Sequence, residues 1–388
     1  MSRPVPQHHE ARRPGDPGYL PEVVDSPGTL TAMVDALMAQ PRAAVDTEAN
    51  SLYTYHERVC LIQISIPGVN YLVDPLALEN LAPLAPFFHS LDVEKVFHAA
   101  DYDLMVMQRD FGFATRRIYD TMWAARVLGW SKVGLADILA SLFDVQVNKR
   151  YQRYDWGKRP LDADALTYAW MDSYYLLQLR ELQKVELETT GRWEEAQEIF
   201  DYLAATVEIP PDDNSVRHFW RFKGVHALHP ADQRKLYHLF MWREHVAEAM
   251  DHPPVKIISN ASLMRLASVQ PRTREELADC GLTPGQIRRF GTDLLKALGS
   301  RELPTLPEPP ESSRLPEDVV ERFNTLKAWR KEVAQARGVD SDVILPNATL
   351  WQLAKHPPAD MARLREVPGI GPWRQRTYGP DILQLTRR

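Results

Sequence analysis

Hydrophobic and polar positions alternate in blocks from about residue 29 to residue 180. The segment TLTAMVDALMAQ predicts a helix at 29–40. Short apolar runs bounded by turn residues predict strands at 42–48, 59–66 and 70–73. The elements predicted further along the chain are a helix around 77–90, a strand at 95–99, helices at 102–111 and 120–129, the apolar segment 134–143 and a long helix from 162.

Three successive strands, followed by alternating strands and helices, predict an α/β domain with a mixed sheet. Residues 181–205 predict further helix, which leads out of this domain.

The remainder of the chain contains an internal repeat. Three pairs of segments match in the same order at offsets of 87 to 88 residues: LFMWREHVA (239–247) with LKAWRKEVA (326–334), NASLMRLA (260–267) with NATLWQLA (347–354), and RRFG (288–291) with QRTYG (375–379). Such a pattern predicts a duplicated all-helical unit. The predicted division of the chain is an N-terminal arm at 1–20, the α/β domain at 21–205, a first helical unit at 206–298, a proline-rich linker at 299–317 and a second helical unit at 318–388.

Composition and charge narrow the class of protein. A chain of 388 residues with 44% hydrophobic residues is typical of a globular protein of two or three domains. Two cysteines, Cys60 and Cys280, form neither a disulfide framework nor a four-cysteine zinc site, so we expect a reducing, cytoplasmic setting. The first 20 residues lack the apolar core of a signal peptide, and no run reaches the roughly 18 apolar residues of a membrane helix.

The net charge of −6 is unevenly distributed. Residues 1–220 carry a net charge of −12, and residues 221–388 carry a net charge of +6. A metal-dependent site followed by a phosphate-binding tail is one explanation for this asymmetry.

Acidic residues follow several predicted strands and helices. Asp46 and Glu48 stand two positions apart at a strand end and therefore point to one face. They are either two solvated acids or ligands of a divalent cation. Asp103 could add a third carboxylate or simply cap the helix that follows. Tyr168 and Asp172 lie one helical turn apart, and each also has an ordinary structural interpretation.

Together these motifs resemble a known family. DTE (46–48), then His-Ala-x-x-x-Asp-Leu (98–104), then Tyr-x-x-x-Asp (168–172) resemble the exonuclease motifs of the DEDD superfamily, tyrosine subgroup. VCLIQIS, DTMWAARVLG and DWGKRPL resemble the ribonuclease D family within it, and the tail repeats resemble tandem HRDC (helicase and RNase D C-terminal) domains. Two departures are the extra acid Asp101 and Ala100, where a glycine is common.

The resemblance implies an RNase H-like domain, 3′→5′ hydrolysis and two divalent cations, Mg²⁺ or Mn²⁺. The catalytic residues that it implies are Asp46, Glu48, Asp103, Tyr168 and Asp172, and the four acids among them are the implied metal ligands. Tyr168 would orient the attacking water, because a phenol with a pKa near 10 is a poor base at neutral pH.

Two further segments have open interpretations. NKRYQRYDWGKRP (148–160) interleaves basic and aromatic residues and either contacts substrate or packs its rings inward. Its candidate substrate-binding residues are Lys149, Arg150, Arg153, Trp156, Lys158 and Arg159. VPGIGPWRQ (367–375) either aims backbone N–H groups at a phosphate or forms a tight turn between helices.

The functional prediction is a 3′→5′ exoribonuclease that trims structured RNA, with transfer RNA precursors as the implied substrate class. A DNA 3′→5′ exonuclease and a non-catalytic nucleic-acid-binding scaffold are the alternatives. A helicase is disfavoured because the chain has no G-x-x-x-x-G-K-[ST] loop.

Overall fold

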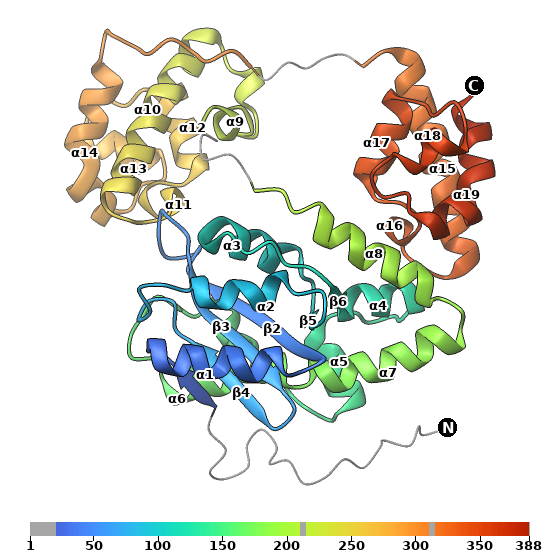
Figure 1. Cartoon of the computed structure of the whole chain (residues 1–388). Coiled ribbons are helices and arrows are strands. Elements are labelled where there is room, and N and C mark those ends of the chain that lie inside the picture. The colour runs from blue at the N-terminus through green and yellow to red at the C-terminus, as the bar shows by residue number, and fades with distance from the viewer. Residues whose placement is uncertain (1–20, 210–214, 310–314, 388) are drawn as a thin grey trace. The chain divides into compact units, whose positions relative to one another are not determined.

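The computed structural model describes residues 21–209, 215–309 and 315–387. The predicted arm at 1–20 lies outside these residues, as does part of the predicted linker. The chain divides into two compact units, shown in Figure 1. One unit combines the α/β part with the C-terminal helical repeat, and the other combines the first repeat with the loop Asn50–Arg58. The domain limits derived from the sequence stay predictions.

A six-stranded mixed sheet forms the centre of the α/β part (Figure 1). Its strands are β1 (Glu22–Val24), β2 (Arg42–Ala49), β3 (Val59–Ile66), β4 (Val69–Val73), β5 (Glu94–Phe97) and β6 (Ile118–Asp120), in the spatial order β1-β4-β3-β2-β5-β6. Strands β2, β3 and β4 are antiparallel to their neighbours in sequence, whereas β1, β5 and β6 join in parallel. The predicted mixed sheet is confirmed. Strands β1 and β6, of three residues each, were not predicted.

Helices cover both faces of this sheet. They are α1 (Pro27–Met38), α2 (Ala85–His89), α3 (Asp101–Phe111), α4 (Thr121–Leu128), α5 (Leu135–Leu142), α6 (Ala163–Tyr174), α7 (Leu176–Thr189) and α8 (Trp193–Ala205). Helix α1 packs on the face that carries Ile62 and Ile64, and α6 packs on the face that carries Leu61. Because β3 is covered on both faces, all eight of its residues are buried.

The helix predicted around 77–90 is present only in part. Only a 3₁₀ turn at Ala82–Leu84 and the short α2 are helical there. Pro83 and Pro86 each stand in the first turn of one of these pieces, where a missing N–H costs no hydrogen bond. A continuous helix would lose hydrogen bonds at both prolines. The long helix predicted from 162 is also divided, at Tyr175, into α6 and α7.

The two repeats share one helical plan. The first contains α10 (Pro230–Ala249), α11 (Pro254–Ile257), α12 (Asn260–Val269), α13 (Arg274–Asp279) and α14 (Pro284–Gly299), preceded by α9 (Ser215–Trp220). The second contains α15 (Glu317–Arg337), α16 (Ser341–Ile344), α17 (Asn347–Lys355), α18 (Met361–Arg365) and α19 (Pro372–Thr386). Each helix of the second repeat begins 87 or 88 residues after its counterpart, as the sequence offsets predicted.

The repeated Trp-Arg pair has a structural explanation. Arg243 and Arg330 occupy equivalent places in the long helices, and both are buried. Arg243 donates to the carbonyl of Ile258 at 3.1 Å, and Arg330 donates to that of Leu345 at 2.8 Å. The arginine of each repeat therefore ties the long helix to the end of the short one that follows. Within the described ranges, no helix is long and apolar enough to cross a lipid bilayer.

Candidate active site

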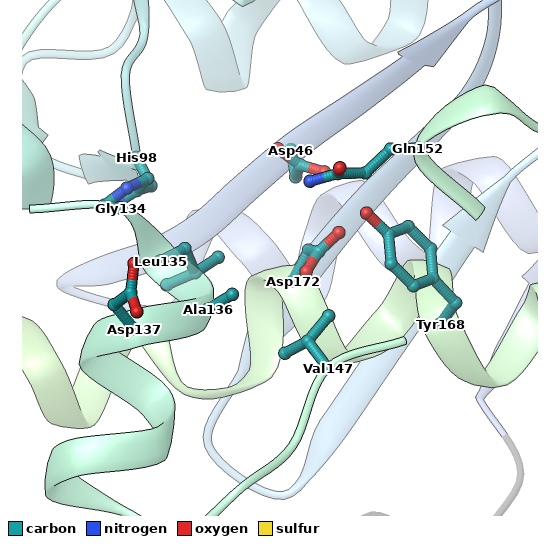
Figure 2. Close-up of a pocket in the computed structure, with 10 residues that line it drawn as sticks. All are labelled: Asp46, His98, Gly134, Leu135, Ala136, Asp137, Val147, Gln152, Tyr168 and Asp172. Atoms are coloured by element: carbon teal, nitrogen blue, oxygen red, sulfur yellow. The ribbon is translucent and has the colours of Figure 1, made fainter. Parts of the chain in front are cut away.

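Three carboxylates meet where β2 passes α6. Asp46 and Glu48 project from one face of β2, and Asp172 projects from α6. Each offers an oxygen within 4.8 Å of the other two. The pairing of β2 with β3 shifts register between Glu48 and Ala49, so the strand is irregular beside the cluster. Figure 2 shows Asp46 and Asp172 together in the pocket, with the hydroxyl of Tyr168 directed toward them.

The three acids disfavour one another's charge. Burial raises the pKa of Asp46 well above its ordinary value, and the charge of Asp172 raises it further. Burial, followed by Asp46 and Asp172, raises the pKa of Glu48 in the same way. Burial raises the pKa of Asp172 to about 7, although the hydrogen bond from Tyr168 opposes the shift. A positive charge at this point would relieve all three groups.

Asp103 lies beside this group on the first turn of α3. It is buried, and its Oδ1 accepts a hydrogen bond of 2.5 Å from the hydroxyl of Thr47, the residue between Asp46 and Glu48. Burial first and Asp46 second raise the pKa of Asp103. The structure thus brings Asp103 to the three carboxylates, although it is not one of the set within 4.8 Å. Asp101 on the same turn is exposed.

A fully buried acid, Asp120, fixes the turn that precedes α3. Its carboxylate accepts hydrogen bonds from the backbone N–H groups of Ala99 (3.2 Å) and Ala100 (2.7 Å). It also accepts two from the first turn of α4, at 2.8 and 3.0 Å. Ala99 has a φ of 63°, a conformation that a non-glycine residue adopts only when its surroundings hold it. Asp120 was not predicted as a site residue, although an Asp before a helix is a recognisable cap.

Tyr168 is held in place by other aromatic rings. Its ring centroid lies 5.5 Å from that of Tyr151 and 6.1 Å from that of Trp156. Burial first, and then the charges of Asp172 and Glu48, raise the pKa of Tyr168 above its ordinary value. The phenol therefore stays protonated and donates its hydrogen bond toward Asp172.

The loop predicted to bind substrate performs a mainly structural role in this conformation. Trp156 is only 2% exposed and Tyr151 only 4%, because both rings pack beneath Tyr168. The prediction that Trp156 offers its face to substrate is therefore corrected. Arg159 is engaged as well, since its guanidinium pairs with Asp74 at 2.6 Å and donates to the carbonyl of Cys60 at 2.7 Å.

The other basic residues of this loop lie at the surface. Arg150, Arg153 and Lys158 are exposed. Arg150 donates to the hydroxyl of Tyr151 at 2.8 Å. The side chain of Lys149 lies outside what the structure describes.

A pocket of about 340 Å³ opens over the carboxylates (Figure 2). Its lining residues are Asp46, His98, Gly134, Leu135, Ala136, Asp137, Val147, Gln152, Tyr168 and Asp172. The sequence did not indicate Gln152 or Asp137 as site residues, because each is an ordinary polar residue until the fold brings it to the pocket wall. His98 forms part of the second motif, and its Nδ1 lies 2.9 Å from the hydroxyl of Thr121.

The glycine segment before α19 is occupied by the chain itself. Glu198 of α8 accepts hydrogen bonds from the N–H groups of Trp373 at 2.8 Å and Arg374 at 3.3 Å. In the first repeat, the equivalent helix is α14, and Thr283 and Gln286 cap its start. An internal group therefore satisfies both helix starts, which favours the structural alternative over phosphate binding.

Comparison with known proteins identifies the domains of this chain. The 3′-5′ exonuclease family model matches residues 21–188, and the HRDC domain model matches residues 232–298 and 320–386. The α/β part therefore corresponds to a 3′-5′ exonuclease domain, and the two helical repeats correspond to HRDC domains. Over nearly its whole length, the chain is similar to ribonuclease D.

Ribonuclease D of Acidiphilium cryptum is 28% identical over 94% of this chain and 93% of its own. That of Haemophilus influenzae is 29% identical over 84% and 83%, respectively. The crystal structure of Escherichia coli RNase D covers 95% of this chain and 99% of its own, with 23% identity and a TM-score of 0.67, and shows that the fold is shared. The catalytic core of RRP6 from Trypanosoma brucei covers 71% of this chain and 78% of its own, with 27% identity and a TM-score of 0.64.

Proposed function

We propose that this protein is a metal-dependent 3′→5′ exoribonuclease that trims the 3′ ends of structured RNA, with transfer RNA precursors as its substrate class. One observation carries the proposal: Asp46, Glu48 and Asp172 bring carboxylate oxygens within 4.8 Å of one another in a pocket that Tyr168 lines. The full-length similarity to proteins named ribonuclease D supports RNA as the substrate.

The residues present suit two hard divalent cations, Mg²⁺ or Mn²⁺. Carboxylate oxygens are the preferred ligands of such ions, and the raised pKa values of the acids reflect a need for positive charge. Asp46, Glu48 and Asp172 would hold one ion, and Asp46 with Asp103 would hold the second. Bound there, the ions would supply Lewis-acid activation of a water molecule and neutralise charge that develops on the scissile phosphate.

Tyr168 orients the attacking water in this proposal. Its pKa lies above the ordinary value of 10, so the phenol cannot serve as a base at physiological pH. As a fixed hydrogen-bonding group beside Asp172, it holds the water in line with the phosphodiester, and its packing on Tyr151 and Trp156 keeps the hydroxyl in place.

Arg150, Arg153 and Lys158 remain proposed contacts to the phosphates of the substrate, because they are exposed cations on the loop that supports Tyr168. We also propose that the protein acts in a reducing compartment such as the cytoplasm, since Cys60 and Cys280 are both buried thiols.

The test uses a 5′-labelled RNA and the matching DNA, each with a 3′ overhang, incubated with Mg²⁺ or Mn²⁺. EDTA and Asp46→Asn serve as controls. We expect a ladder that shortens from the 3′ end on RNA and is absent from both controls. A ladder mainly on DNA would show a DNA exonuclease. Binding without metal-dependent cleavage of either strand would leave a non-catalytic scaffold as the better account.

A further inference from the structure

Gln63 stands within VCLIQIS on β3 and is none of the five residues of the three exonuclease motifs. On β3 it is the direct antiparallel partner of Asp46 on β2. Directly opposite residues share a face of the sheet, with their Cβ atoms about 4.5–5.5 Å apart. Ser65, two positions along the same face of β3, has its Oγ 2.7 Å from that of Ser173, the neighbour of Asp172. The side chain of Gln63 is therefore enclosed between the sheet and α6.

The amide of Gln63 has no hydrogen-bond partner in the described part of the chain. The side chain is 0% exposed, yet neither its Nε2 nor its Oε1 makes a hydrogen bond. Buried side-chain amides are almost always paired, so such a group needs an explanation. Gln183, also 0% exposed, shows the usual outcome in this domain: its Nε2 donates to the carbonyl of Thr121 at 2.8 Å, and its Oε1 accepts from Tyr119 at 3.4 Å.

The strand register points to Asp46 as the partner of the Gln63 amide. The hydroxyl of Ser65 is engaged with Ser173 and with Asn70. Asp46 directly faces Gln63 across the strand pair and, once ionised, has lone pairs beyond those that a cation uses. Carboxylates that bind metal ions are usually fixed by a further hydrogen bond from a neighbouring residue.

We propose that Gln63 is a positioning residue whose amide N–H donates to the carboxylate of Asp46 when the cluster holds a divalent cation. The bond fixes which oxygen of Asp46 faces the ion. The inference depends on the proposed function only in assigning a cation to this cluster, and it concerns affinity for the cation rather than the identity of the nucleic acid.

The test compares Gln63→Met with Gln183→Met, two substitutions of equally buried glutamines by an apolar side chain of similar length. Mn²⁺ is titrated calorimetrically into the metal-free full-length protein, and thermal unfolding is measured in EDTA. For Gln63→Met we expect Mn²⁺ affinity to fall about tenfold. Its melting temperature should be unchanged or higher, because two unpaired polar atoms are removed. For Gln183→Met we expect a lower melting temperature and wild-type Mn²⁺ affinity.

A second readout separates positioning from general damage. In the presence of RNA, turnover by Gln63→Met should return toward the wild-type value as Mn²⁺ is raised far above its dissociation constant. Unchanged Mn²⁺ affinity in Gln63→Met, or equal losses of affinity in both variants, would overturn the proposal, as would a wild-type protein that binds no Mn²⁺. A wild-type protein that binds Mn²⁺ but cleaves no RNA would refute the proposed function, while the affinity comparison would still decide the role of Gln63.

Discussion

Glu198 on α8 and Arg374 on α19 form a buried ion pair between the α/β part and the second repeat. The Nη1 of Arg374 lies 3.2 Å from Oε1 of Glu198, and the backbone N–H of Arg374 also donates to this carboxylate. The guanidinium further donates to the carbonyls of Val343 and Ile344 at 2.8 Å each. Gln286, at the matching position of the first repeat, donates to the carbonyl of Ile257 at 2.8 Å and caps its own helix together with Thr283. The start of α19 in the second repeat is thus capped by a side chain of α8. The start of α14 in the first repeat is capped by residues of that repeat itself.

Removing Glu198 should therefore destabilise the protein strongly. Glu198→Ala leaves the fully buried Arg374 without its counter-charge, and we expect a loss of about 3–5 kcal/mol in the free energy of unfolding. Denaturant unfolding measures the change. Glu194→Ala is the matched control, because Glu194 lies on the same helix and pairs with the largely exposed Arg376, a contact worth about 1 kcal/mol or less. Similar losses in both variants would contradict the importance of the buried pair.

Tyr168→Phe should reduce turnover while preserving the fold and RNA binding. The phenylalanine ring retains the packing on Tyr151 and Trp156, and only the hydroxyl beside Asp172 is lost. We expect the turnover number to fall about 100-fold or more, with little change in the dissociation constant for RNA measured in EDTA. Single-turnover kinetics and filter binding provide the two quantities.

Tyr151→Phe is the control for this prediction. Its hydroxyl accepts only the 2.8 Å hydrogen bond that the structure shows from the exposed Arg150, so its loss should leave turnover within a few-fold of the wild-type value. A Tyr168→Phe enzyme with wild-type turnover would remove the hydroxyl from the mechanism.

Local patterns predicted the parts of this molecule that depend on local geometry. The apolar run of β3, the i, i+2 spacing of Asp46 and Glu48, and the repeat offset can each be found in the sequence without knowledge of the fold. Three-residue strands such as β1 and β6 carry too few positions for any periodicity, and they form because a longer strand pairs with them.

Contacts between distant segments were beyond prediction. Trp156 lies in a basic loop, where the sequence is equally consistent with a base-stacking residue and with a buried one. Only its packing under Tyr168 shows that it is buried. Gln63 looks like an ordinary strand residue until its cross-strand partner is known to be Asp46. Glu198 is one of several acids on α8. Only its pairing with a buried arginine of the second repeat distinguishes it from Glu194, which pairs with an exposed one.

The carboxylate cluster should make the metal-free protein less stable as the pH rises. The pKa of Asp172 is about 7 in the folded protein, above its ordinary value of 3.8. Its contribution to stability is therefore fully present below about pH 4 and is lost as the pH rises through 7. In EDTA at pH 8, Asp172→Asn should unfold with a free energy higher than wild type by on the order of 2–4 kcal/mol, and the difference should shrink at pH 5.

Saturating Mn²⁺ should reverse this order at pH 8, because the ion binds the ionised carboxylates of the folded wild-type protein and stabilises it. Urea unfolding at both pH values, with and without Mn²⁺, gives the four comparisons. Asp318→Asn, at an exposed acid in the first turn of α15 that pairs with Arg322, should alter none of them by more than about 0.5 kcal/mol. A metal-free Asp172→Asn protein that is less stable than wild type at pH 8 would contradict the electrostatic account of the site.

Asp120 should control the site through the turn at Ala99 rather than by touching the substrate. Its buried carboxylate holds four backbone N–H groups, two before α3 and two at the start of α4. Asp120→Asn replaces one acceptor oxygen with an NH₂ group that faces donors, so we expect a loss of about 2–3 kcal/mol in unfolding free energy. Because α3 carries Asp103, Mn²⁺ affinity should fall as well. Asp162→Asn is the control: Asp162 caps α6 by accepting a hydrogen bond of 2.7 Å from the N–H of Ala165, and Asn caps a helix equally well. If Asp120→Asn lowered stability yet left Mn²⁺ affinity unchanged, Asp120 would support the fold without positioning Asp103.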